Sequence, residues 1–253
     1  MTVRWLALLF AGCGFQIGTG VAIEDASNDA SNDASNDAPR DAPGDATDAS
    51  PLDAPDAPIT PVAFCNSLDP NLRGCYRFEG NLDDGSMYAN GGAGVGAYTS
   101  ANGHIGQALV AANSTITVPF DASLSTAEFT LQLWIRPTIY PATSVARMGL
   151  LDNNSFRLMV HYGGVVRCAL NTGVQDLYTT TAVPLATWTR VTCIYDRATL
   201  KIYFNGIEQA SANHNVGLDG LSTGTTIGRQ EPSGDPFVGL IDDVRIFSAP
   251  VAP

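Results

Sequence analysis

The chain has 253 residues and a formal net charge of −12, from 13 basic and 25 acidic side chains. Proteins that bind nucleic acid need a basic face toward the phosphates, so this composition argues against a nucleic-acid partner. Most of the negative charge lies in one segment. Residues 24–61 carry ten acids and one base, whereas residues 62–253 carry fifteen acids and eleven bases. The part that can fold is therefore only mildly acidic.

The first residues have the order of an export signal. Arg4 precedes the short apolar run WLALLFA, and small residues lead to Cys13. The run is too short to span a bilayer, which needs about 20 apolar residues. Cysteine after Phe-Ala-Gly resembles a bacterial lipobox, although Phe10 stands where leucine is usual. We expect cleavage after residues 1–12 and lipidation of Cys13, which would anchor the chain in the bacterial cell envelope. An ordinary signal that is cleaved nearby, with loss of Cys13, is the alternative.

Residues 13–61 are predicted to be a disordered linker. From residue 24 the sequence repeats Asp-Ala about every four residues, with Ser, Asn and Pro between. It has almost no branched or aromatic residues, so it cannot bury enough surface to offset chain entropy. Charge repulsion and proline would keep it extended as a spacer. Weak calcium capture by these aspartates is an alternative, but a flexible chain lacks the oxygen cage of a calcium site.

The cysteine count agrees with export. Five cysteines are present, and lipidation of Cys13 would leave four for disulfides: Cys65, Cys75, Cys168 and Cys193. Cys65 and Cys75 are nearest in sequence, and the other two lie on apolar faces of predicted strands, where a bridge would be buried. Four cysteines allow three connectivities, and the sequence does not choose among them. Free buried thiols are a further alternative.

Residues 62–253 are predicted to form one all-β domain. No stretch of ten or more residues has helical apolar spacing, whereas many short alternating runs are separated by Gly, Asn, Asp and Pro. This pattern favours a two-sheet antiparallel sandwich. The predicted strands are residues 74–79, 107–111, 114–118, 128–136, 147–151, 156–162, 165–170, 176–181, 187–195, 199–205, 207–212, 225–228 and 238–247.

Five motifs follow one another along this domain. They are CYRFEGNLDDGSMYANGG from Cys75, GHIGQALVAANSTITVP from Gly103, FTLQLWIRP from Phe129, a WTRVTCIYD strand with an LKIYFNG hairpin, and GLIDDVRIF. Asn-Gly in the hairpin supplies a type I′ turn. Together the motifs resemble the laminin-G-like domain of the concanavalin A-like lectin/glucanase superfamily. The resemblance implies a jelly roll, but not one function, because this fold hosts lectins, hydrolases, adhesion modules and scaffolds.

Catalytic carboxylates are not evident in the pattern. Glycoside hydrolases place two carboxylates across the scissile bond. The glutamates of the domain have no carboxylate partner two or four residues along a strand: these are Glu79, Glu128, Glu208 and Glu231. Adjacent aspartates, as in Asp242-Asp243, should point to opposite faces of a strand. The histidines His104, His161 and His214 show no zinc or nucleophile spacing. We therefore predict a domain that is not an enzyme.

Asp242 is the candidate metal ligand. In FVGLIDDVRIF, alternation places it on an apolar face with Leu240 and Val244, whereas Asp243 shares the other face with Arg245. A lone buried carboxylate is costly unless it is paired or binds a cation. For Asp243, pairing with Arg245 is an adequate explanation.

The resemblance implies a structural calcium ion at Asp242. Its other ligands would be Glu79 in the first strand and oxygens near Gly103, since calcium takes six to eight oxygen ligands. The alternative is that Asp242 caps backbone amides or pairs with an arginine such as Arg77. The sequence leaves both open.

The predicted function is non-catalytic binding of a glycan or an extracellular protein. Aromatic and amide groups near strand ends are candidate contacts, although packing is the more usual role of such residues. Trp134, opposite the Leu131/Leu133/Ile135 face, could lie on a concave surface, but core packing is the favoured interpretation. The alternatives are a structural or adhesion domain without a small-ligand site, and a degenerate glycoside hydrolase. The other candidate contacts are Tyr98, Tyr140, Tyr162, Tyr178, Phe237 and Asn153-Asn154.

Overall fold

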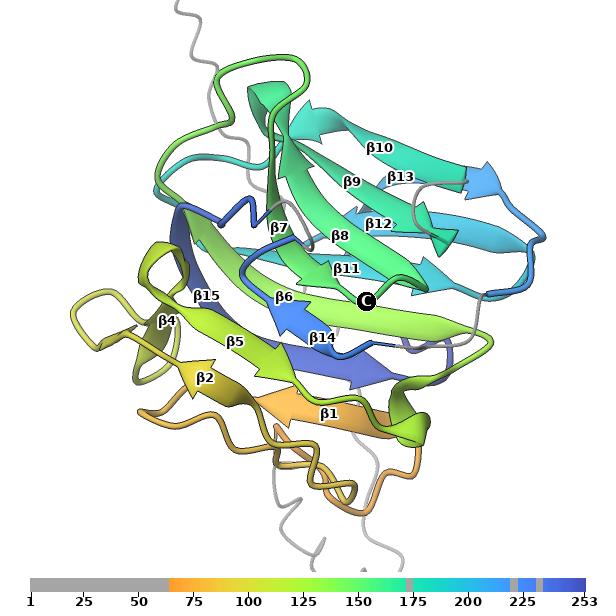
Figure 1. Ribbon diagram of the computed structural model, residues 1–253. Helices are drawn as coiled ribbons and strands as arrows, with labels where there is room; N and C mark the ends of the chain where they lie inside the picture. Colours follow the sequence, from red (N-terminus) through yellow and green to blue (C-terminus); the bar gives the residue numbers. More distant parts are fainter. Residues whose placement is uncertain (1–63, 172–174, 219–222, 231–233) are drawn as a thin grey trace, which may run out of the picture. The chain divides into compact units, whose positions relative to one another are not determined.

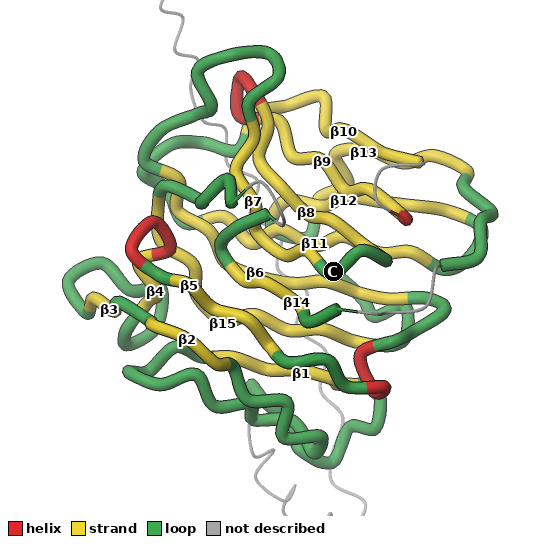
Figure 2. Tube along the Cα trace, in the orientation of Figure 1, coloured by secondary structure: helices red, strands yellow, loops and turns green. Residues whose placement is uncertain are grey.

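The computed structural model describes residues 64–171, 175–218, 223–230 and 234–253. The predicted signal, Cys13, the predicted linker and Glu231 lie outside the described residues. Helix in the described part consists of short 3-10 turns: η1 (Ala111–Asn113), η2 (Ala122–Leu124) and η3 (Tyr162–Gly164) (Figure 2). No helix in these ranges is long and apolar enough to cross a membrane.

The strands form two layers (Figure 1). Sheet A contains β1 (Leu72–Tyr76), β3 (Tyr98–Thr99), β4 (Ala108–Val110), β6 (Phe129–Pro137), β11 (Thr189–Tyr195), β12 (Thr199–Phe204), β13 (Ile207–Asn213) and β15 (Gly239–Phe247). Sheet B contains β2 (Ala93–Val95), β5 (Thr115–Val118), β7 (Arg147–Asp152), β8 (Phe156–His161), β9 (Val165–Leu170), β10 (Gln175–Ala182) and β14 (Thr225–Ile227). The order is β13-β12-β11-β6-β15-β4-β3 in sheet A, with β1 beside β15, and β10-β9-β8-β7-β14-β5-β2 in sheet B.

The predicted fold class is confirmed, since the described chain is an antiparallel jelly-roll sandwich. Each predicted strand is present, with ends shifted by a few residues. The first strand is β1, which ends at Tyr76 because Phe78 takes a left-handed φ of 57°. The pattern missed β2 and β3, which are short and lack a buried alternating face.

The register of β6 and β11 separates the core from the site. Leu133 lies opposite Val191, and Leu131 lies opposite Cys193; all four are fully buried between the sheets. Alternation turns the intervening residues, such as Trp134, to the other side of sheet A. We call this side the outer face of sheet A.

Two disulfides are present, Cys65–Cys75 and Cys168–Cys193. Of the three possible connectivities, this is the one with the nearest partners in sequence. The first ties the segment entering the domain to β1. The second joins β9 of sheet B to β11 of sheet A inside the core, because both of its cysteines are fully buried. It therefore links the two layers covalently.

Removing the inter-sheet bridge should destabilise the domain. In the chain-entropy model, a bridge closing a loop of this size contributes roughly 3 kcal/mol to the free energy of unfolding. We expect Cys168→Ala combined with Cys193→Ala to lower the urea midpoint accordingly, and reduction of the unaltered chain to lower it further by also opening Cys65–Cys75. An unchanged midpoint in the double variant would contradict this role.

Candidate functional site

A β-bulge in β15 sets the geometry of the site. Asp242 lies opposite Trp134 of β6, and Arg245 lies opposite Gln132. Between these two pairs, β15 has two residues where β6 has only one. Asp243, in the bulge, takes a left-handed φ of 49°. Aspartate tolerates this conformation better than most side chains. The bulge brings both aspartates to the outer face.

The bulge overturns two predictions made from simple alternation. Ile241 before it and Val244 after it both join the core, so the inward face changes from odd to even residues. Asp242 therefore does not share an apolar face with Val244; it lies on the outer side with the half-buried Leu240. Adjacent aspartates were also expected to diverge, yet oxygens of Asp242 and Asp243 lie within 4.8 Å of each other.

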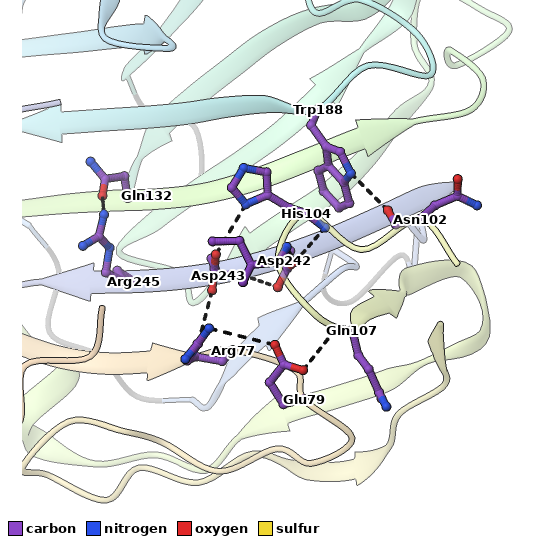
Figure 3. Close-up of polar contacts among 11 residues, drawn as sticks. Arg77, Glu79, Asn102, His104, Gln107, Gln132, Trp188, Asp242, Asp243 and Arg245 are labelled. Carbon is purple, nitrogen blue, oxygen red and sulfur yellow. Dashed lines mark hydrogen bonds and ion pairs between the residues drawn. The ribbon is translucent and has the colours of Figure 1, made fainter. Parts of the chain in front are cut away.

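Asp242 holds a loop across the outer face. This loop, residues 102–107, is called the cap loop. The Oδ2 atom of Asp242 accepts hydrogen bonds from the backbone amides of His104 (3.1 Å) and Ile105 (3.2 Å), and Oδ1 accepts from the amide of Asp243 (2.8 Å) (Figure 3). The carboxylate has no exposed surface. The structure thus shows the amide-capping role that the sequence left open.

Asp243 lies between the imidazole ring of His104 and the guanidinium of Arg77. Its Oδ2 is 3.5 Å from His104 Nδ1, and its Oδ1 is 3.7 Å from Arg77 Nε. The predicted pairing with Arg245 is wrong, because the bulge changes the spacing along β15. The Arg245 guanidinium donates instead to the side-chain oxygen of Gln132 (Figure 3).

Glu79 secures the far end of the cap loop. Its Oε2 accepts from the Gln107 amide at 3.0 Å, and its Oε1 is 4.0 Å from Arg77 Nη2. Gly106 takes a left-handed φ of 69°, and a Cβ there would lie 2.3 Å from the Glu79 carboxylate. The residues that the resemblance groups together, Asp242, Glu79 and the turn at Gly103, are therefore brought to one corner of sheet A.

The cap loop places an aromatic group on the outer face. The His104 ring stacks on Trp134 with centroids 3.8 Å apart, and Trp188 meets it edge-on at 5.8 Å. The Trp188 indole Nε1–H donates to the Asn102 carbonyl at 3.0 Å (Figure 3). Neither tryptophan belongs to the core. For His104 the sequence predicted only an ordinary surface or core role. Its position next to Gly103 was the only feature of the sequence that linked it to the site.

The other candidate contacts divide into two groups. Phe237 is fully buried in the core, and Asn153 is buried with its side-chain oxygen accepting from a backbone amide. The Tyr140 hydroxyl donates to a backbone carbonyl. Tyr162 and Tyr178 are more open, with 53% and 43% of their surface exposed, but they lie with sheet B, away from the cap loop.

The contacts around Asp242 offer an alternative to calcium, although Asp242, Asp243 and His104 place possible metal-ligand atoms within 4.8 Å of one another. Calcium takes six to eight oxygen ligands. The Asp242 oxygens face amide hydrogens, and the Arg77 guanidinium lies close to the carboxylates of both Asp243 and Glu79. Backbone amides and one guanidinium group therefore already contact these carboxylates. The calcium ion implied by the resemblance stays a prediction, and this geometry favours amide capping in its place.

Thermal unfolding distinguishes these roles of Asp242. Because N–H groups satisfy the carboxylate, we expect the melting midpoint to be the same with calcium as with a chelator. Elemental analysis of the purified chain is the control, because it detects calcium that stayed bound through purification. A midpoint several degrees higher with calcium, together with a stoichiometric bound ion, would contradict amide capping.

Burial gives Asp242 an unusual proton affinity. Burial, and next the charge of Asp243, raise the pKa of Asp242 to about 7, against the opposing effect of the three amide hydrogen bonds. Burial also raises the pKa of Asp243, although Arg77 and His104 oppose it. A folded pKa above the unfolded value means that the folded chain retains a proton which the unfolded chain has lost.

The free energy of unfolding should therefore fall as the pH rises from about 4 to about 7, by at most about 1.4 kcal/mol per pH unit, and then level off. Urea unfolding at a series of pH values measures this slope. Asp242→Asn should flatten it, whereas Asp83→Asn, at an exposed position, should leave it unchanged. Stability that rises through this window in the unaltered chain would contradict the account.

Comparisons with known proteins agree with this architecture. A laminin-G-type family model, described as concanavalin A-like lectin/glucanases superfamily, matches residues 110–253. No curated protein matches the chain. Domain 4 of AbnA, a GH43 extracellular arabinanase from Geobacillus stearothermophilus solved in complex with arabinotriose, aligns with a TM-score of 0.57 at 22% identity, covering 71% of this chain and 93% of that domain.

Two toxin binding domains are also similar. The binding domain of Paraclostridial Mosquitocidal Protein 1 aligns with a TM-score of 0.59 at 15% identity, over 72% of this chain and 49% of that one. The receptor binding domain of botulinum neurotoxin mosaic serotype C/D gives 0.56 at 17% identity, over 72% and 48%. The chain spans about half of these toxin domains, and at such identities the likeness shows the fold alone. The family model covers more than half of the chain, so this protein belongs to the concanavalin A-like lectin/glucanases superfamily.

Proposed function

We propose that this domain is a non-catalytic glycan-binding module. The observation that carries the proposal is the placement of Trp188, His104 and Trp134 on the outer face of sheet A instead of in the core. Sugar rings present C–H faces that lie against aromatic rings, while polar groups nearby fix their orientation. Trp188 is half-buried, and its bond to Asn102 holds the indole in one orientation.

Similar folds support a glycan as the ligand class. The arabinanase domain was solved with arabinotriose, and a botulinum neurotoxin DC binding domain was solved in complex with SialylT. Those ligands belong to those proteins. What supports a glycan here is that the outer face of sheet A combines indole rings with guanidinium and amide groups, the chemistry that sugars require.

The carboxylates of the site support binding over hydrolysis. A glycosidase needs two carboxyl groups that reach either side of the scissile bond. Asp242 has no exposed surface and Asp243 has 2%, and both lie beneath or beside the cap loop. Their contacts are with amides, His104 and Arg77, so in this proposal they position the loop and do not touch the ligand.

The proposal places this module outside the cytoplasm, on a lipid at Cys13. The support is the signal-like residues 1–12, the acidic spacer of residues 13–61 and the two disulfides, which form in oxidising compartments. The spacer would hold the domain away from the membrane of the cell envelope.

A glycan array tests the binding function directly. The full chain carrying Cys13→Ser, which leaves the described residues unchanged, should bind a subset of glycans, and Trp188→Ala should weaken this binding about tenfold, the loss expected for one aromatic stacking contact. Tyr178→Ala removes an exposed aromatic group from sheet B, away from the cap loop, and is the control. Silence across the array, with binding to an extracellular protein instead, would contradict the proposal, as would loss of binding in Tyr178→Ala alone.

A further inference from the structure

Two arginines lie on the outer face of sheet A, beside the tryptophans. Arg190 of β11 lies opposite Trp134 of β6, and Arg245 of β15 lies opposite Gln132 of β6. Residues paired across strands share a face, and so do residues two apart along a strand. The two guanidinium groups therefore extend over β6 from its two sides.

Neither arginine forms an ion pair within the described residues. No carboxylate in those ranges comes within 4.0 Å of either guanidinium, and the Nε atoms of both are buried without a hydrogen-bond partner. Arg245 donates to the neutral amide of Gln132 and lies 4.3 Å from the centroid of the Phe64 ring. The nearest acid along β15, Asp243, is engaged with Arg77 and His104.

The two positive charges oppose each other. Burial, and next the charge of Arg190, lower the pKa of Arg245, and the charge of Asp243 offsets this only in part. Half-buried cations without a counterion are unfavourable, so an anion between them would be bound strongly. This local excess of positive charge stands out in a chain of net charge −12.

We propose that Arg190 and Arg245 bind the carboxylate of an acidic oligosaccharide whose sugar ring lies against Trp188. This inference rests on the proposed glycan-binding function and deepens it by naming the ligand class. A guanidinium fork matches a planar carboxylate in geometry, and Trp134 next to Arg190 in the sheet keeps the charged and aromatic contacts adjacent. A neutral sugar could offer hydroxyl oxygens to these N–H groups, but no negative charge to balance the two guanidinium groups.

Matched pairs of oligosaccharides test the inference. The probes are trimers of glucuronate, galacturonate and mannuronate, each compared with the neutral hexose trimer of the same linkage, titrated against the full chain carrying Cys13→Ser. At least one acidic member should bind ten or more times as tightly as its neutral partner, because roughly tenfold is a modest gain for one charge-assisted contact. Added salt should reduce this difference in affinity.

Variants assign the preference to the arginine pair. Arg190→Gln should lower acidic binding to the level of the neutral trimer, and Arg190→Lys, which keeps the charge but not the fork, should lose most of the preference. Lys201→Gln removes a half-buried cation from a neighbouring strand of sheet A and should keep the preference. Binding of neutral trimers by Arg190→Gln shows that the variant is folded.

The outcomes separate this inference from the proposed function. Equal binding of acidic and neutral trimers by the unaltered chain would overturn the arginine site while leaving glycan binding intact. Equal loss of preference in Lys201→Gln and Arg190→Gln would also overturn it, because it would indicate general charge attraction. Absence of binding to any trimer and to every glycan of the array would overturn the proposed function itself.

Discussion

The outer face of sheet A depends on two carboxylates that accept backbone N–H groups, one of them fully buried and one partly exposed. Asp242 at the β15 bulge and Glu79 after β1 each accept backbone amides of the cap loop, and together they fix it across the sheet. Because the loop is held at both ends, its groups have fixed positions. The His104 ring stacks on Trp134, and the Asn102 carbonyl accepts a hydrogen bond from the indole of Trp188. Asp242 thus shapes the site from beneath the loop, whereas Glu79 holds the loop from a partly exposed position.

Much of the fold could be predicted from the sequence, because most strands bury one face. In β6, Leu131, Leu133 and Ile135 alternate with the polar or larger residues of the outer face, and this period indicates a strand. The cysteines on inward faces of β9 and β11 indicated a buried bridge. β2 and β3 escaped detection because they bury no alternating residues and pair only at sheet edges.

The site was harder to predict, for two physical reasons. Alternation assumes an unbroken pleat, and a bulge shifts every later residue to the other face; in IDDVRIF nothing but the paired aspartates hints at one. Contacts distant in sequence were also inaccessible. His104 meets Asp242 across 138 residues of chain, so the spacing of histidines could not reveal its role. The resemblance brought Asp242, Glu79 and the turn at Gly103 together, but it assigned them to an ion and not to the amides they bind.

The fold of this chain does not by itself determine its function. A sandwich of this kind can bind, hydrolyse or only support other domains, and the core of this chain would serve any of these. The distinguishing features are local: two tryptophans turned outward, two arginines without a carboxylate, and aspartates withdrawn beneath a loop. These features concern one face of one sheet; in the proposed function the acids belong to the architecture and the aromatic and cationic groups to recognition.

The most direct measurement is nuclear magnetic resonance of side-chain N–H groups during a ligand titration. The full chain carrying Cys13→Ser is labelled with nitrogen-15 and titrated with an oligosaccharide that it binds. The account predicts that the indole signal of Trp188 and the Nε signals of Arg190 and Arg245 shift together with one saturation curve, while Arg167, beside Tyr178 on sheet B, stays unchanged. Shifts confined to Arg167 and its neighbours, with Trp188 and Arg190 unmoved, would contradict it.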